Sequence, residues 1–108
     1  MNKTNAISSI VSFTALKFNA IPSSENIQIK PTIWNITGDY SKKWTAQNSI
    51  ASPISVSYSI GDFAPDTLYN ITVNGSILGT FTSDASGEIN FVYFGAFDSL
   101  KTFEIKVP

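Results

Sequence analysis

Hydrophobic and polar residues alternate along much of this chain, with the two-residue period of β-strands. The run from Ile54 to Ile60 shows it most clearly, because isoleucine, valine and tyrosine alternate there with three serines. Such a run predicts a strand with one buried face and one solvated face. The same period predicts strands over 10–18, 27–36, 69–73, 77–82, 88–94 and 100–107, with a short strand or an irregular bridge over 42–45. Since no 3.6-residue helical period is present, the chain is predicted to be all-β.

The stretch from Gly61 to Gly75 predicts how one sheet passes to the next. Pro65 fixes its own φ and ends the preceding strand, and residues then alternate from Tyr69 to Val73 until Asn74 and Gly75 favour a tight hairpin. This order resembles the tyrosine corner of immunoglobulin-like and fibronectin type III domains, in which a tyrosine at the start of a strand bonds back to the preceding loop. We therefore predict that the 108 residues form a single domain, an immunoglobulin-like antiparallel β-sandwich of seven to eight strands.

Two segments depart from the simple alternation. Pro31 cannot donate a ladder hydrogen bond, so the strand over 27–36, with Ile27, Ile29 and Ile33 expected on one face, should lie at an edge or carry a bulge. Residues 1–20 faintly resemble a leader peptide, but serines and threonines dilute the apolar region. We interpret this segment as an extra N-terminal strand.

The composition limits the possible functions mainly because several residue types are absent or rare. Charged residues make up 14% of the chain, below the usual quarter, and Ser, Thr and Asn replace them, as in many extracellular β-domains. The chain has no His, no Cys and no Arg, which excludes imidazole and thiolate catalysis, and its net charge of −1 argues against nucleic-acid binding. No segment approaches membrane-spanning length, so no membrane insertion is expected. We expect a non-enzymatic extracellular or cell-surface protein without a cofactor.

Three aromatic residues, Trp34, Tyr40 and Trp44, fall within eleven residues and lie beside Lys42 and Lys43. Aromatic rings flanked by polar groups fit the apolar faces and hydroxyl edges of sugars, which makes a polysaccharide the candidate ligand. The candidate ligand-binding residues are therefore Trp34, Tyr40, Trp44 and Lys43. The alternative is that these rings stabilise the fold and bind no ligand. A tryptophan of a central strand usually belongs to the core, and this applies more to Trp34 than to Trp44. Tyr40 is more typical of a lid over the end of the sandwich.

A weaker candidate is a calcium loop, because Asp84, Ser86 and Glu88 place oxygen atoms at every second position. A complete calcium loop supplies more carboxylates. The favoured interpretation is therefore a polar hairpin with Gly87 in the left-handed conformation, and no metal is expected.

Two bulky rings, Tyr93 and Phe94, end the strand predicted over 88–94. Adjacent residues of a strand point to opposite faces, so one of the two rings should lie outside. An exposed ring at a strand end is a modest indication of a recognition surface, although packing beneath the following loop is commoner.

Several short motifs together resemble one family. They are Trp34 to Tyr40 with Lys43-Trp44, Gly61-Asp62 with Tyr69, Val73 to Gly75, Thr82 to Gly87, and Thr102 to Ile105. The set is similar to immunoglobulin-like modules appended to secreted archaeal and bacterial polysaccharide-active enzymes. The resemblance covers about 27–107 and leaves the first twenty residues outside it.

This resemblance implies a non-catalytic accessory module that binds polysaccharide or spaces and stabilises its enzyme. A second hypothesis belongs to a different class, a structural domain that self-associates. In that hypothesis, residues 1–20 add as a strand to the open edge of a neighbouring copy and so build extracellular fibres or oligomers.

Overall fold

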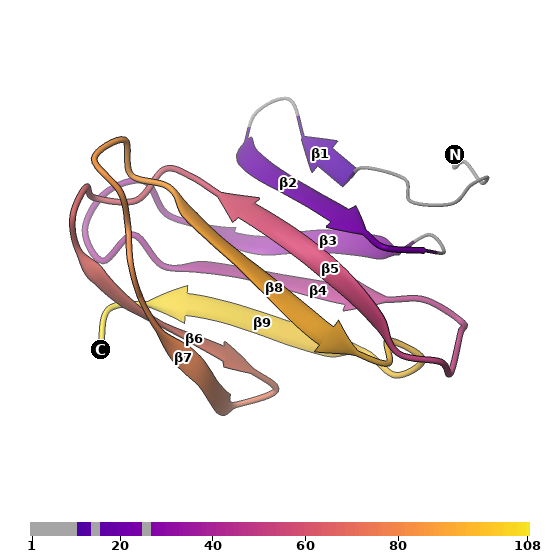
Figure 1. Cartoon of the computed structure of the whole chain (residues 1–108). Coiled ribbons are helices and arrows are strands. Elements are labelled where there is room, and N and C mark those ends of the chain that lie inside the picture. Colours follow the sequence, from indigo (N-terminus) through magenta and orange to yellow (C-terminus); the bar gives the residue numbers. More distant parts are fainter. Residues whose placement is uncertain (1–10, 14–15, 25–26) are drawn as a thin grey trace.

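The computed structural model describes residues 11–13, 16–24 and 27–108, and these residues form strands and turns without helices (Figure 1). They make nine strands in chain order. The strands are β1 (Val11–Phe13), β2 (Leu16–Pro22), β3 (Gln28–Trp34), β4 (Lys42–Gln47), β5 (Ile54–Ile60), β6 (Leu68–Val73), β7 (Ser76–Thr82), β8 (Ile89–Gly95) and β9 (Lys101–Lys106).

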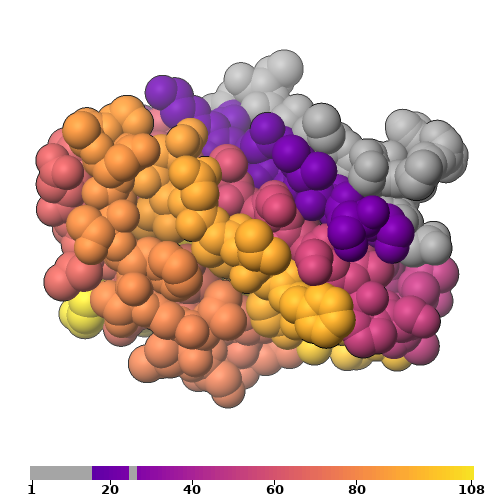
Figure 2. Space-filling model, in the orientation of Figure 1, coloured from indigo at the N-terminus to yellow at the C-terminus, as the bar shows by residue number. Residues whose placement is uncertain are grey.

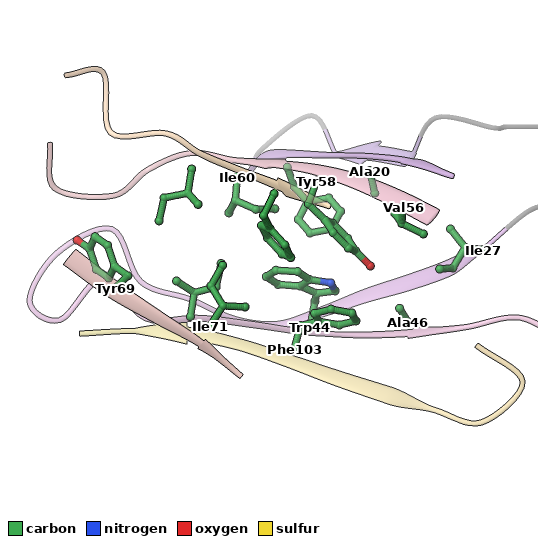
Figure 3. Close-up of a cluster of buried hydrophobic side chains, with 14 of the residues drawn as sticks. Ala20, Ile27, Trp44, Ala46, Val56, Tyr58, Ile60, Tyr69, Ile71 and Phe103 are labelled. Carbon is green, nitrogen blue, oxygen red and sulfur yellow. The ribbon is translucent and has the colours of Figure 1, made fainter. Parts of the chain in front are cut away.

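The strands form two sheets, which we name sheet A and sheet B. Sheet A has the order β1-β2-β5-β8, and sheet B has the order β3-β4-β9-β6-β7. All neighbouring strands are antiparallel. The buried side chains fill the space between the two sheets (Figure 3). The predicted all-β antiparallel sandwich is therefore confirmed.

The strand count exceeds the expected seven to eight because the N-terminal segment is divided differently. The stretch predicted as one strand over 10–18 contributes β1 and the beginning of β2, which pair with each other. Strand β2 also pairs with β5, and its Phe18 and Ala20 are 3% and 0% exposed. Residues 11–13 and 16–20 therefore belong to the sandwich itself, whereas the prediction for residues 1–10 lies outside the described residues.

The connectivity differs from the immunoglobulin order in the placement of the last strand. In an immunoglobulin constant-type sandwich the final strand lies at the end of its sheet. Here β9 lies between β4 and β6, inside sheet B. One neighbour of β9 thus precedes β5 in the chain and the other follows it, an order that strand patterns alone do not reveal.

The corner between β5 and β6 has the predicted hydrogen bond. The backbone N–H of Ala64 donates to the Tyr69 hydroxyl at 3.1 Å, and Tyr69 is fully buried. After β6 the chain turns through Asn74 and Gly75, whose φ angles of 51° and 85° are those of a tight hairpin. The tyrosine corner and the hairpin are both confirmed.

Pro31 acts as expected on β3, an edge strand of sheet B whose register shifts between Pro31 and Ile33. The shift changes the face on which the following residues lie. Ile33 is consequently 39% exposed, so the expectation that it shares the inner face with Ile27 is wrong. The strand predicted over 100–107 is also shorter than expected, since Val107 follows the end of β9 and is 42% exposed.

Candidate functional site

Trp44, one of the four predicted ligand-binding residues, lies in the centre of the core. It is 0% exposed, and its ring stacks on Phe103 with centroids 5.3 Å apart and an interplanar angle of 2° (Figure 3). Phe18 and Tyr58 pack against the same indole, each with its ring centroid at 5.2 Å. Because no face of the indole reaches the surface, the prediction that Trp44 stacks on a sugar is wrong.

Lys42, two residues earlier on the same face of β4, is also buried and 0% exposed. Its Nζ donates hydrogen bonds to three backbone carbonyls. These are the carbonyl oxygens of Asn35 at 2.6 Å, Tyr40 at 3.0 Å and Asp62 at 2.7 Å. A buried ammonium is costly unless it is hydrogen-bonded, and these bonds use all three of its donors.

Three aromatic rings surround this ammonium. Their centroids lie 5.3 Å (Trp34), 5.7 Å (Tyr40) and 4.3 Å (Phe63) from Lys42 Nζ, within the range of cation–π attraction. Burial lowers the pKa of Lys42 from 10.5 to about 8, against the opposing effect of the Asp62 and Asp39 carboxylates. The rings of Trp34 and Tyr40 are thus engaged within the protein.

The backbone around Lys42 adopts uncommon angles at two non-glycine residues. Tyr40 has a φ of 56° and Asp62 a φ of 64°, in the left-handed region. The carbonyls of these two residues accept hydrogen bonds from Lys42, and the Asp62 carboxylate accepts one from Trp34 Nε1 at 3.0 Å. We infer that the ammonium holds both turns in place, which makes this cluster a clamp that closes one end of the sandwich.

Lys43, the fourth predicted ligand-binding residue, lies on the opposite face of β4 from Trp44. It is half-buried, and its register partners are Ile33 in β3 and Glu104 in β9. Adjacent strand residues point to opposite faces, so the charge and the indole that the glycan hypothesis combined are separated. Of the four residues, the structure brings only Trp34 and Tyr40 together, and it does so around Lys42.

The calcium candidate is a turn that joins β7 of sheet B to β8 of sheet A, so the expected hairpin is wrong because these two strands do not pair. Asp84 Oδ1 accepts hydrogen bonds from Ser86 N at 2.9 Å, from Ser86 Oγ at 2.7 Å and from Glu88 N at 2.9 Å. These bonds, first that of the Ser86 hydroxyl, lower the pKa of Asp84. Gly87 has the expected left-handed φ of 81°. Among the residues that the structure describes, no three potential ligands are grouped to hold a metal ion.

The edges of the two sheets reveal a different candidate, because three of the four edge strands carry features that impede the pairing of a further strand. Strand β1 has only three residues and a register shift. Strand β3 has Lys30, Pro31 and a register shift, and β7 contains Gly79 and shifts its register against β6.

Strand β8 has a glycine only as its last residue, Gly95, and it has none of the other features. Its seven residues, Ile-Asn-Phe-Val-Tyr-Phe-Gly, include no charge and no proline, and they pair with β5 in an unbroken register. No described strand pairs with its other side. On its outer face Val92 is 60% exposed and Phe94 is 68% exposed, so Phe94 is the predicted outward ring. Figure 2 shows the orange surface of the β8 region on this face of the molecule. Tyr93 is half-buried beside Phe97 and Phe103.

Sequence reasoning overlooked both the Lys42 cluster and the β8 edge, although each leaves a signal. The alternation of Lys42, Trp44 and Ala46 already places the lysine on the inner face of its strand. The run of β8 is long, uncharged and rich in aromatic residues, which is typical of strands that pair with other chains. What the sequence could not reveal is that β8 lies at an edge, since that depends on the strand order.

Comparison with known protein families, with curated proteins and with solved structures found no match for this chain. The resemblance to accessory modules of polysaccharide-active enzymes therefore stays a prediction. Within the described residues, no helix is long and apolar enough to cross a membrane.

Proposed function

We propose that this chain is a non-catalytic assembly domain that joins copies of itself by adding a strand at the β8 edge. The observation that carries the proposal is the contrast among the edge strands: β8 alone is long, regular and uncharged. An unprotected edge offers a row of backbone donors and acceptors to an incoming strand. Val92 and Phe94 add apolar surface beside it.

The charge distribution supports a second copy as the partner. The net charge is −1, so copies experience little long-range repulsion. Lys17 is the only charged residue in β2, β5 and β8. Sheet B, by contrast, has six charged residues in its strands, which are Lys30, Lys42, Lys43, Lys101, Glu104 and Lys106. An extracellular or cell-surface location fits the low charge and belongs to the same proposal.

Polysaccharide binding through the aromatic cluster is less well supported. Trp44 is enclosed, and Trp34 and Tyr40 are half-buried around Lys42. A sugar would need an exposed ring face, and these three residues do not form an exposed platform.

Sedimentation velocity over a wide concentration range tests the proposal with two matched lysine substitutions. Val92→Lys places a charge on the β8 edge, and Gln28→Lys places the same charge on an exposed position of the β3 edge. We expect the wild type and Gln28→Lys to associate alike, and Val92→Lys to associate at least about tenfold more weakly, which corresponds to about 1.4 kcal/mol. A wild type that stays monomeric, or two variants that behave identically, would reject the proposal.

A further inference from the structure

We infer that the strand added at the β8 edge is β8 of a second copy, running antiparallel across a two-fold axis that passes through Val92. This inference rests on the proposed function and deepens it by naming the donor. The sequence hypothesis made residues 1–20 the donor, but Leu16–Pro22 already pairs with β5 of its own sheet. That part of the segment is therefore already paired within its own sheet and cannot be donated to another copy. Strand β8, in contrast, has an unpaired side among the described strands.

The two-fold register uses the full length of the strand. Val92 is the central residue of Ile89–Gly95, so antiparallel self-pairing through Val92 places Asn90 opposite Phe94 and Phe91 opposite Tyr93. With the axis perpendicular to the sheet, outer residues meet outer residues and inner residues meet inner residues. The two four-stranded sheets then become one continuous eight-stranded sheet, in the isologous arrangement typical of homodimers.

The side chains suit this pairing on both faces. On the inner face, each Phe91 meets a Tyr93, and the large Ile89 meets the small Gly95. On the outer face, Val92 meets its own copy. Phe94 of one copy lies diagonally from Val92 of the other, so the most exposed apolar side chains of β8 cover each other.

No like charges oppose each other in this register. The seven paired residues carry no charge, and Glu88, the nearest acid, falls opposite Ala96. A β3–β3 pair would instead bring together strands that each contain Lys30 and the proline-associated bulge. The charge pattern therefore permits self-pairing at β8 and opposes it at β3.

Cysteine substitution can test the register directly, because the wild-type chain has no Cys. Val92→Cys places two thiols opposite each other on the axis, where the Cβ atoms of paired residues lie about 5 Å apart. The matched control is Ser57→Cys, since Ser57 is the register partner of Val92 on β5 and is also exposed. Two Ser57 positions would lie about 14 Å apart, three strand spacings, which is too far for a disulfide.

We expect mild oxidation to give a disulfide-linked dimer with Val92→Cys and at least tenfold less with Ser57→Cys, with circular dichroism confirming that both variants fold. Deletion of residues 1–10 should leave association unchanged. If that deletion abolishes association and Val92→Cys gives no dimer, the N-terminal segment is the donor. The inference of β8–β8 pairing is then wrong, but the proposed assembly at the β8 edge is retained. If the wild type is monomeric at every concentration, the inference and the proposed function both fail.

Discussion

The β3–β4 side and the β8 side of this sandwich place their aromatic residues in opposite ways. On the β3–β4 side, Trp44 lies in the core and Trp34 packs around a buried lysine, while Lys30 and Pro31 protect the edge. On the β8 side, Phe94 points into solvent beside an edge that carries no such protection. The difference teaches that clustering of aromatic residues in a sequence does not by itself mark a recognition surface. The strand face and the position of the strand in the sheet decide the role of each ring.

The largest expected effect separates the two kinds of ring. Trp44→Ala should lower the free energy of unfolding by about 3–5 kcal/mol, because it removes a fully buried indole and leaves a cavity beside Phe103. Phe94→Ala, the control on the exposed side, should change it by no more than about 0.5 kcal/mol. Urea denaturation measures both values. Similar losses for the two variants would contradict the assignment of one ring to the core and one to the surface.

The next effect concerns the clamp at Lys42. Lys42→Met keeps a long side chain but leaves the carbonyls of Asn35, Tyr40 and Asp62 without their donor, so we expect a loss of about 2–3 kcal/mol in unfolding free energy. Lys43→Met, one residue further and on the outer face, should cost less than about 1 kcal/mol. Equal stability of the two variants would show that the buried ammonium contributes nothing to closing the end of the sandwich.

The pH dependence of stability should reveal the same group. Burial lowers the pKa of Lys42 to about 8, so between about pH 8 and pH 10 the unfolded chain holds a proton that the native protein has released. Stability should therefore rise by roughly 1–2 kcal/mol over that interval. Above about pH 10 it should fall, because burial raises the pKa of Tyr58 and of Tyr69, and the unfolded tyrosines lose their protons first. Denaturation curves of the wild type and of Lys42→Met at each pH measure this, and a rise that persists in Lys42→Met would assign it to another group.

The smallest expected effect comes from removing the protection of β3. The double substitution Lys30→Thr with Pro31→Val should give a second edge able to pair, and sedimentation should show species larger than a dimer. The gain in affinity should be no more than about tenfold, because differences in strand propensity span about 1 kcal/mol. In a Val92→Lys background the same change should produce dimers at most. An unchanged sedimentation profile would mean that other features of β3 prevent pairing.

Much of the fold could be predicted from the sequence, because the local signals agree with one another. The alternation over Ile54 to Ile60, the tyrosine corner at Tyr69 and the Asn74-Gly75 turn all appear as expected. Each depends on residues close together in the chain, where period and turn chemistry determine the outcome. Pro31 likewise indicated an edge or a bulge, and β3 shows both.

The candidate site was less predictable because it depends on contacts between distant residues. The burial of Trp44 requires Phe18 and Phe103 from two other strands, and the Lys42 clamp requires Asp62 from the following corner. The position of β8 at an edge depends on the entry of β9 into the middle of sheet B. Periodicity carries no information on strand order, which explains why the sequence did not identify β8 as an open edge.

Backbone amide exchange, measured on dilute and concentrated samples of the wild type, tests the assembly at β8 most directly. If β8 pairs with a second copy, the amides of Ile89–Gly95 that point away from β5 should exchange at least tenfold more slowly in the concentrated sample. The amides of the protected β3 edge should exchange at the same rate in both. Equal exchange of β8 at the two concentrations, or slower exchange confined to β3, would contradict the account.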